Sequence, residues 1–171
     1  TMKPFVILSL FVFSLFACSP KKEVKTIAVT QVEDSIQQPL SQALPKLVQL
    51  PGDLYQKLDM DEWESLTRWM REFEDFSKLD TKGVELFLNG LDLRTRTFSK
   101  SAFPEKLDIF PVRSRLKVVL MQTQKAKFYA KNQQREELIP ALDTLYRHYN
   151  SFLNRIISVG EEESIEPEEL D

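Results

Sequence analysis

The chain is poor in the residues from which many kinds of site are built. Its 171 residues include one Cys, one His and four Gly. One Cys excludes a disulfide-stapled fold and a Cys-rich zinc module, and four Gly exclude a collagen-like repeat. One His excludes most two-histidine metal sites and most histidine relays. The length, with 42% hydrophobic and 29% charged residues, is that of one globular domain.

Known catalytic motifs are missing as well. The sequence contains no H-E-x-x-H, E-x-x-H, C-x-x-C-H, G-x-S-x-G or Walker-type loop. Carboxylate pairs such as Asp61 with Glu64 fall on the polar face of an expected helix, where they keep the protein soluble. We therefore expect no enzymatic activity, no catalytic residue and no bound metal or cofactor. The net charge of −3 gives no ground for nucleic-acid binding.

A charge-free apolar run follows the basic start Met2-Lys3 and ends at the single cysteine. The run covers residues 4–16, which fits the hydrophobic region of a signal peptide and is shorter than the roughly 20 residues that span a bilayer. The sequence Leu15-Phe16-Ala17-Cys18 then resembles a lipobox, the recognition site of the bacterial lipoprotein signal peptidase. An ordinary secretory signal and an N-terminal anchor helix are the alternatives.

The resemblance to bacterial lipoproteins implies a lipid anchor. It implies cleavage between Ala17 and Cys18, a diacylglycerol on Cys18, and fatty acyl chains such as palmitate that together hold the protein at a membrane. Ser19 follows the cysteine, so the Asp that retains some Gram-negative lipoproteins in the inner membrane is absent. The expected location is the cell envelope or periplasm, with lipid anchoring at the outer membrane favoured, and nucleic acid is not an expected partner.

The rest of the chain divides into three parts. After the signal peptide (1–17), residues 18–52 carry the lipidated Cys and a polar tether interrupted by four prolines, with a mean reach of about 30 Å if flexible. A short helix or a strap against the body is possible near its end. Residues 53–160 read as a helical body, and residues 161–171, with seven acidic side chains in eleven, as a disordered acidic tail.

Apolar periodicity predicts four helices in the body. They span about 60–79, 82–98, 112–131 and 136–159. In the first, Asp59 with Glu62 resembles a capping box, and in the last an a/d seam ends at Gly160, as a helix often ends at glycine. Four such helices with short connections predict an all-α fold, an antiparallel four-helix bundle. The body resembles small helical envelope lipoproteins of unknown role.

Basic charge is concentrated in one stretch. Residues 94–131 hold 10 basic and 2 acidic side chains, whereas residues 53–92 hold 5 basic and 11 acidic. These cations either pair with acidic neighbours inside the bundle or form a face for an acidic partner or anionic lipid. Arg113 and Arg115 oppose the dipole of a helix start, unless a carboxylate such as Asp108 neutralises them. The candidates for partner binding are Trp69, Arg94, Arg96, Arg113, Arg115 and Lys117.

Two residues allow alternative interpretations. Trp69 lies off the apolar stripe of the first helix, so it is either an exposed anchor for a partner or part of a wide buried interface. His148 with a methionine would resemble the ligand pair of four-helix b-type cytochromes, which makes a bundle that binds a small ligand such as haem the alternative function. The leading expectation is a non-enzymatic accessory subunit of an envelope complex, anchored in membrane lipid through acylated Cys18.

Overall fold

The computed structural model describes residues 43–79 and 83–163, and it shows an all-α fold without β-strands in these ranges. The lipobox and residues 164–171 of the predicted acidic tail lie outside the described residues, whereas residues 161 and 162, which the sequence assigns to a disordered tail, are helical. The elements, in chain order, are α2 (Asp53–Lys57), α3 (Glu64–Ser77), α4 (Val84–Ser99), the 3-10 helix η3 (Glu105–Leu107), α5 (Phe110–Lys131) and α6 (Arg135–Glu162).

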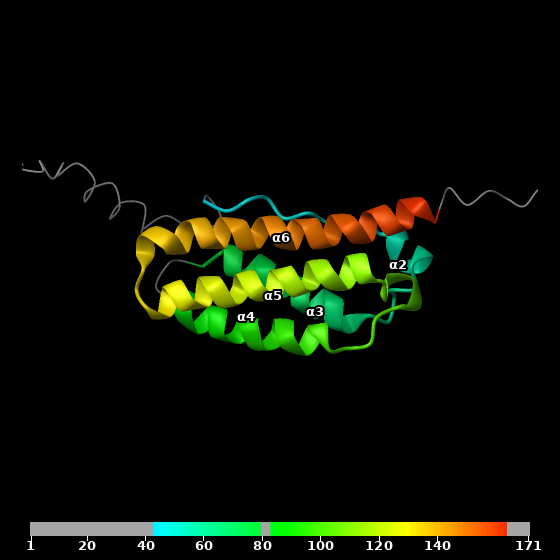
Figure 1. Ribbon diagram of the computed structural model, residues 1–171. Helices are drawn as coiled ribbons and strands as arrows, with labels where there is room; N and C mark the ends of the chain where they lie inside the picture. Colours follow the sequence, from blue (N-terminus) through cyan, green and yellow to red (C-terminus); the bar gives the residue numbers. More distant parts are fainter. Residues whose placement is uncertain (1–42, 80–82, 164–171) are drawn as a thin grey trace, which may run out of the picture.

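Helices α3 to α6 form an antiparallel four-helix bundle, as predicted. In Figure 1, α4, α5 and α6 lie side by side and successive helices run in opposite directions, with α3 behind them. Ring contacts give the direction of α3, because its residues meet α6 in reverse order: Trp69 contacts Phe152 and Phe76 contacts Tyr146. Helix α5 lies close to both α4 and α6, whereas large rings fill the space between α3 and α6.

A layer of aromatic rings forms the centre of the core. The Phe73 ring stacks on Tyr149 with 4.1 Å between centroids, and the Trp69 ring stacks on Phe98 at 4.9 Å. The Tyr146 hydroxyl donates a 2.7 Å hydrogen bond to the Phe73 carbonyl. Burial raises the pKa of Tyr146, so this hydroxyl keeps its proton. Each of these contacts therefore joins α3 to a neighbouring helix, α4 or α6.

Two helix ends differ from the predictions. Helix α3 begins at Glu64 and has no side-chain cap, because Asp59 adopts a left-handed conformation (φ 55°) in the turn after α2; the predicted capping box is wrong. Helix α6 continues past Gly160 to Glu162, so that glycine does not end it. A Cβ at Gly160 would collide with the Leu54 side chain, which indicates that the glycine makes room for α2.

Residues 43–50 form a strap along α6. Leu44 is buried, and the Asn150 side chain binds the strap backbone on both sides: its Oδ1 accepts from the Val48 N–H at 3.0 Å and its Nδ2 donates to the Lys46 carbonyl at 2.8 Å. The sequence assigns residues 18–52 to a tether and leaves open a strap against the body near its end. The described part of that segment is such a strap and packs against the core.

One buried carboxylate joins α4 to α5. Asp92 is 5% exposed and accepts hydrogen bonds from Lys127 on α5 (2.8 Å) and from Arg96 one turn further along α4 (2.9 Å). Burial raises the pKa of Asp92, but the two cations outweigh it and leave the pKa below its usual range. Part of the basic charge of residues 94–131 is thus neutralised inside the bundle.

Replacing this carboxylate tests its contribution. We expect Asp92→Asn to lower the free energy of unfolding by about 1–3 kcal/mol, because two charge-assisted hydrogen bonds weaken and Lys127 loses its partner. Since the folded-state pKa lies below the unfolded value of 3.8, the difference from wild type is fully present above that pH. It should shrink as the pH falls through the folded-state pKa. Urea titrations at a series of pH values measure it.

The matched control is Asp75→Asn. Asp75 pairs with Lys78 at 3.2 Å, and both side chains are more than half exposed, so the change should lower stability by less than about 0.5 kcal/mol. Equal losses for the two variants at neutral pH would contradict a special role for Asp92.

Candidate interaction surfaces

Trp69 is a core residue, so the interpretation as an exposed anchor is wrong. Its side chain is 2% exposed, and its indole N–H donates a 2.9 Å hydrogen bond to the Thr95 hydroxyl. Helix α3 packs against two helices at once, α4 and α6, which widens its buried face beyond a single stripe. The stripe read from the sequence was too narrow to include this position.

Three of the predicted cations are held by carboxylates. Arg94 pairs with Glu72 of α3 at 3.0 Å, and Arg96 pairs with Asp92. Arg113 binds Asp108 at 2.7 Å, as predicted for a neutralising carboxylate. The hydrogen bond from Arg113 is also the main cause of the lowered pKa of Asp108.

Arg113 also organises the connection between α4 and α5. Its guanidinium donates to the Ser99 carbonyl at 3.1 Å and lies 3.7 Å from the centroid of the Phe103 ring. Phe103 in turn contacts Trp63 and Phe98. Arg113 therefore has a structural role, and its charge is not free for a partner.

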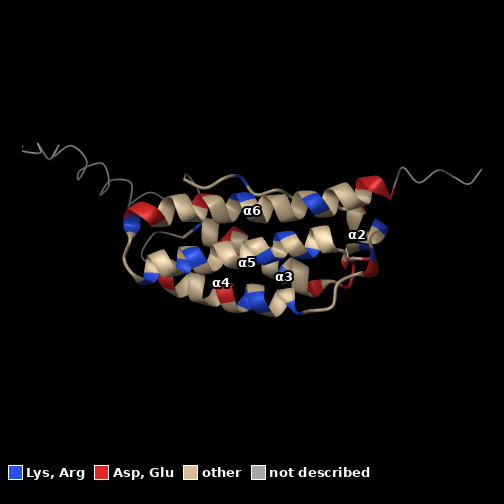
Figure 2. Cartoon of the chain, viewed as in Figure 1, with Lys and Arg blue, Asp and Glu red and all other residues tan. Residues whose placement is uncertain are grey.

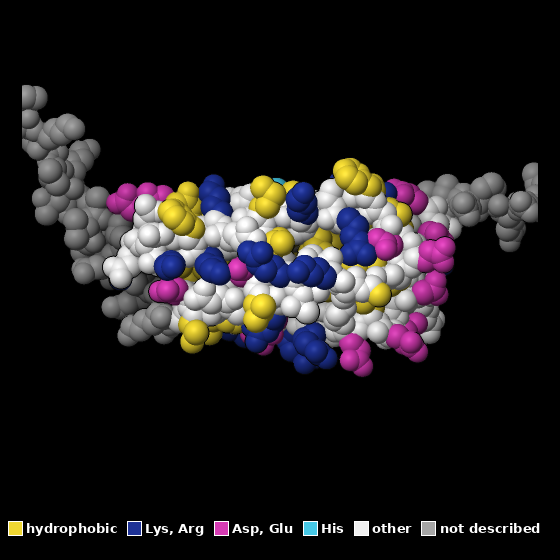
Figure 3. All heavy atoms as spheres, turned by 60° about the horizontal axis from the view of Figure 1, so that its bottom comes forward, with side chains coloured by type: hydrophobic (Ala, Val, Ile, Leu, Met, Phe, Trp, Pro, Cys, Tyr) yellow, Lys and Arg dark blue, Asp and Glu magenta, His cyan; other side chains and the backbone are white. Residues whose placement is uncertain are grey.

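The outward stripe of α5 alternates apolar and cationic side chains, and exposed leucines lie on the outward side of α4. On α5, Met121 is 56% exposed and Phe128 57% exposed, and they are interleaved with exposed Lys117 and Lys125. Helix α4 adds exposed Leu86 and Leu93. We call these six residues the α4–α5 face. Figures 2 and 3 show Lys and Arg along these helices, with acidic side chains gathered mainly toward the ends of the bundle.

A shallow groove lies beside this face, between α3 and α4. It has a volume of about 310 Å³ and is lined by Ser65, Arg68, Trp69, Leu93, Arg94, Thr97, Phe98 and Ser101. The structure therefore brings two predicted site residues together, Arg94 at the edge and Trp69 in the wall. Leu93 belongs to both the groove and the α4–α5 face, so the two surfaces are continuous.

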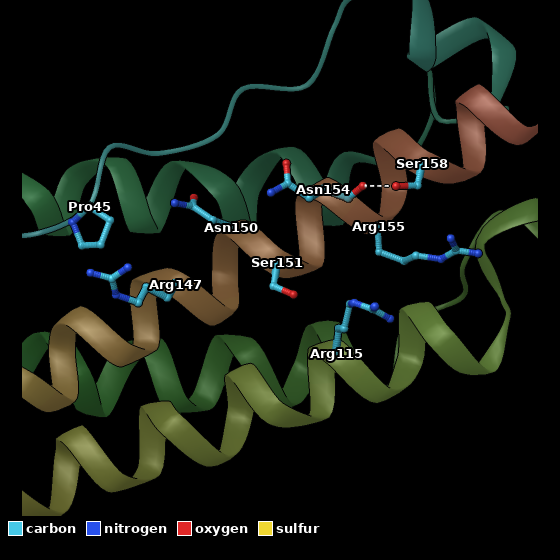
Figure 4. A pocket seen from close by; sticks show the side chains of 8 residues that line it. All are labelled: Pro45, Arg115, Arg147, Asn150, Ser151, Asn154, Arg155 and Ser158. Carbon is cyan, nitrogen blue, oxygen red and sulfur yellow. Dashed lines mark hydrogen bonds between the residues drawn. The ribbon is translucent and has the colours of Figure 1, made fainter.

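A second, larger groove runs between α5, α6 and the strap. It has a volume of about 510 Å³, and we call it the arginine groove. Its lining consists of Pro45, Arg115, Arg147, Asn150, Ser151, Asn154, Arg155 and Ser158. Figure 4 shows Arg155 and Ser151 projecting from α6 on the side of α5, and Arg115 projecting from α5 toward them. Asn150 points instead toward the strap.

Sequence reasoning found only Arg115 of this groove. The six residues from α6 lie at positions 147, 150, 151, 154, 155 and 158, the three- and four-residue spacing of one helix face. The sequence is sufficient to predict this polar stripe, which lies beside the apolar seam of the same helix. It is not sufficient to predict that residues of α5 and the strap join the stripe, because that depends on tertiary packing.

The proposed histidine site gains no geometric support. His148 is half-buried beside Tyr149, and the middle of the bundle is filled by the aromatic layer, which a ligand would have to displace. Within residues 43–79 and 83–163, no group of three or more His, Cys, Asp or Glu is placed to hold a metal ion. None of the helices there is long and apolar enough to cross a membrane.

Comparison of the chain with protein-family models, with curated proteins and with solved structures finds no match. What the surfaces bind is therefore inferred from their own chemistry.

The strap offers a test of how the N-terminal segment is joined to the body. We expect Asn150→Ala to detach the strap locally, since the Val48 N–H and the Lys46 carbonyl both lose their partner. Hydrogen exchange at Val48 should become at least about tenfold faster. Asn154→Ala, one turn further on, is the control, because the Asn154 side chain has no hydrogen bond to a described residue. Equal protection of Val48 in all three proteins would show that Asn150 does not hold the strap.

Proposed function

We propose that the chain is a lipid-anchored lipoprotein of the cell envelope whose helical body is a non-enzymatic interaction module. It would act as an accessory subunit that docks to another envelope protein through the α4–α5 face. The anchor rests on the resemblance of residues 15–18 to a lipobox, with the outer membrane as the favoured location. The docking role rests on the α4–α5 face itself.

The single observation that carries the docking role is the exposure of large apolar side chains there. Leucine, methionine and phenylalanine that remain more than half exposed on neighbouring helices are typical of a surface that a partner covers. The lysines between them favour a partner whose apolar patch is bordered by carboxylates. Such a surface needs no catalytic group, which agrees with the absence of catalytic motifs from the sequence.

Docking can be tested with paired substitutions on α5. A tagged wild-type chain is extracted from its native envelope in mild detergent, and stoichiometric companions are identified by mass spectrometry. We expect Met121→Ser with Phe128→Ser to reduce recovery of a companion at least about tenfold, since buried apolar anchors dominate interfaces. Helix content by circular dichroism should not change, because neither side chain is buried in the core.

The matched control is Ile139→Ser, which changes an exposed apolar residue at the start of α6. It should leave the companion in place. A companion that survives the double substitution, or none in the wild type, would contradict docking through this face. Reversal of Arg113 is not a suitable test, because that residue supports the α4–α5 connection.

Lipid anchoring is tested separately with Cys18→Ala. The wild-type chain should stay in the membrane fraction after a high-salt wash and incorporate labelled palmitate, because several acyl chains bind a bilayer firmly. The variant should incorporate no label and keep its uncleaved N-terminus. Labelling of the variant at the wild-type level would show that Cys18 is not the acylated residue.

A further inference from the structure

The arginine groove contains a guanidinium without an acidic partner. Arg115 donates to the Pro111 carbonyl at 2.9 Å, and no carboxylate of the described residues lies within 4.0 Å of it. Its side chain lines the groove and projects from α5 toward α6 (Figure 4). Ser151, from α6, is exposed there and its hydroxyl has no hydrogen bond to a described residue. Two donors from different helices thus point into the same space.

The guanidinium of Arg155, near Arg115 in the groove, has an acidic partner but also an N–H group without an acceptor. Arg155 forms a bidentate pair with Glu162, at 2.7 Å and 3.1 Å, yet its Nε is buried and has no acceptor. Its side chain is 20% exposed, so it is held in place by the surrounding helices. The net charge of this group is +1, from the two guanidinium groups of Arg115 and Arg155 and the carboxylate of Glu162. At the far end, Arg147 is paired with Asp143.

The lining of the groove selects for an oxyanion. Of the described residues that line it, none is acidic, and seven of the eight carry side-chain N–H or O–H donors. A planar carboxylate presents two oxygens in one plane, whereas these donors approach from α5 and from α6. A phosphate group is tetrahedral and accepts from several directions at once, and arginine is its usual partner.

We propose that the arginine groove is a binding site for a phosphate group, held by Arg115, Ser151 and Arg155. The group belongs either to a phospholipid headgroup or to a free phosphorylated compound, and the volume of about 510 Å³ accommodates both. The proposal goes beyond the docking role, uses a different surface, and does not depend on an envelope partner. Glu162 competes with the phosphate for Arg155, so this residue limits the affinity.

The test is a titration of the full chain in neutral detergent and phosphate-free buffer, followed by NMR. Inorganic phosphate should produce saturable shifts confined to Arg115, Ser151, Arg155 and their neighbours. Short-chain phosphatidic acid, added to the same micelles, separates the two sources. Saturation at a concentration at least tenfold lower than for inorganic phosphate assigns the site to a lipid headgroup, and equal concentrations assign it to a free phosphate compound.

Two substitutions with opposite effects make the test specific. Arg115→Gln should weaken phosphate binding about tenfold, because it removes the uncompensated charge. Glu162→Gln should strengthen it severalfold, because it frees the Arg155 guanidinium. The control Arg68→Gln makes the same charge change on an exposed residue of α3 and should leave binding unchanged. Circular dichroism confirms that each variant is folded.

Three results would overturn the proposal. The first is a titration that does not saturate, and the second is a set of shifts spread equally over the lysines of the α4–α5 face. The third is Arg115→Gln binding phosphate as tightly as Arg68→Gln. The first two describe a general response to ionic strength, which screens every exposed charge, and the third would show that Arg115 does not bind the phosphate.

Discussion

The packing of large aromatic rings between α3 and α6 is the contact on which the rest of the structure depends. Trp69 and Phe73 on α3 meet Tyr149 and Phe152 on α6 through their rings, so the two helices are held apart by side chains. Burying rings of this size gives more free energy per residue than aliphatic packing does, and edge and stacked pairs add to it. The hydrogen bonds of the Trp69 indole N–H and the Tyr146 hydroxyl satisfy polar groups that would otherwise be buried without a partner.

Helix α6 shows how one element serves both the core and a surface. Its buried side includes Leu145, Tyr149, Phe152 and Ile156, and its polar stripe includes the α6 residues of the arginine groove. Asn150 belongs to that stripe, and it holds the strap by mimicking a peptide group that both donates and accepts. Because the strap covers one edge of α6, the groove has three walls instead of two. A helix of 28 residues is long enough to contact the strap, α2 and three other helices.

The sequence was sufficient for features that depend on local periodicity. Four amphipathic stripes predicted four helices in nearly the right places, and short connections then required antiparallel neighbours. Features that depend on distant contacts were missed or left as open alternatives. From the sequence, Gly160 is predicted to end the helix. In the structure it lies against the Leu54 side chain inside α6. The strap is only one of two alternatives from the sequence, because Pro45 interrupts any hydrophobic period there. The hydrogen bonds that hold the strap come from Asn150, about 100 positions away. The burial of Trp69 was one of two alternatives from the sequence, because one stripe cannot represent a helix that is buried on two sides.

The charge of residues 94–131 separates into two groups with different consequences. Four cations form ion pairs with carboxylates within the body, namely Arg94, Arg96, Arg113 and Lys127. Removal of these cations would lower the stability of the fold. Lys117, Lys125 and Arg115 have no such partner within the described residues, so a ligand or partner can use their charge without breaking an internal pair. A net count of basic residues treats these groups alike. Only the partner of each side chain distinguishes a cation that stabilises the fold from one that remains available, and α5 supplies an available cation to each of the two proposed surfaces.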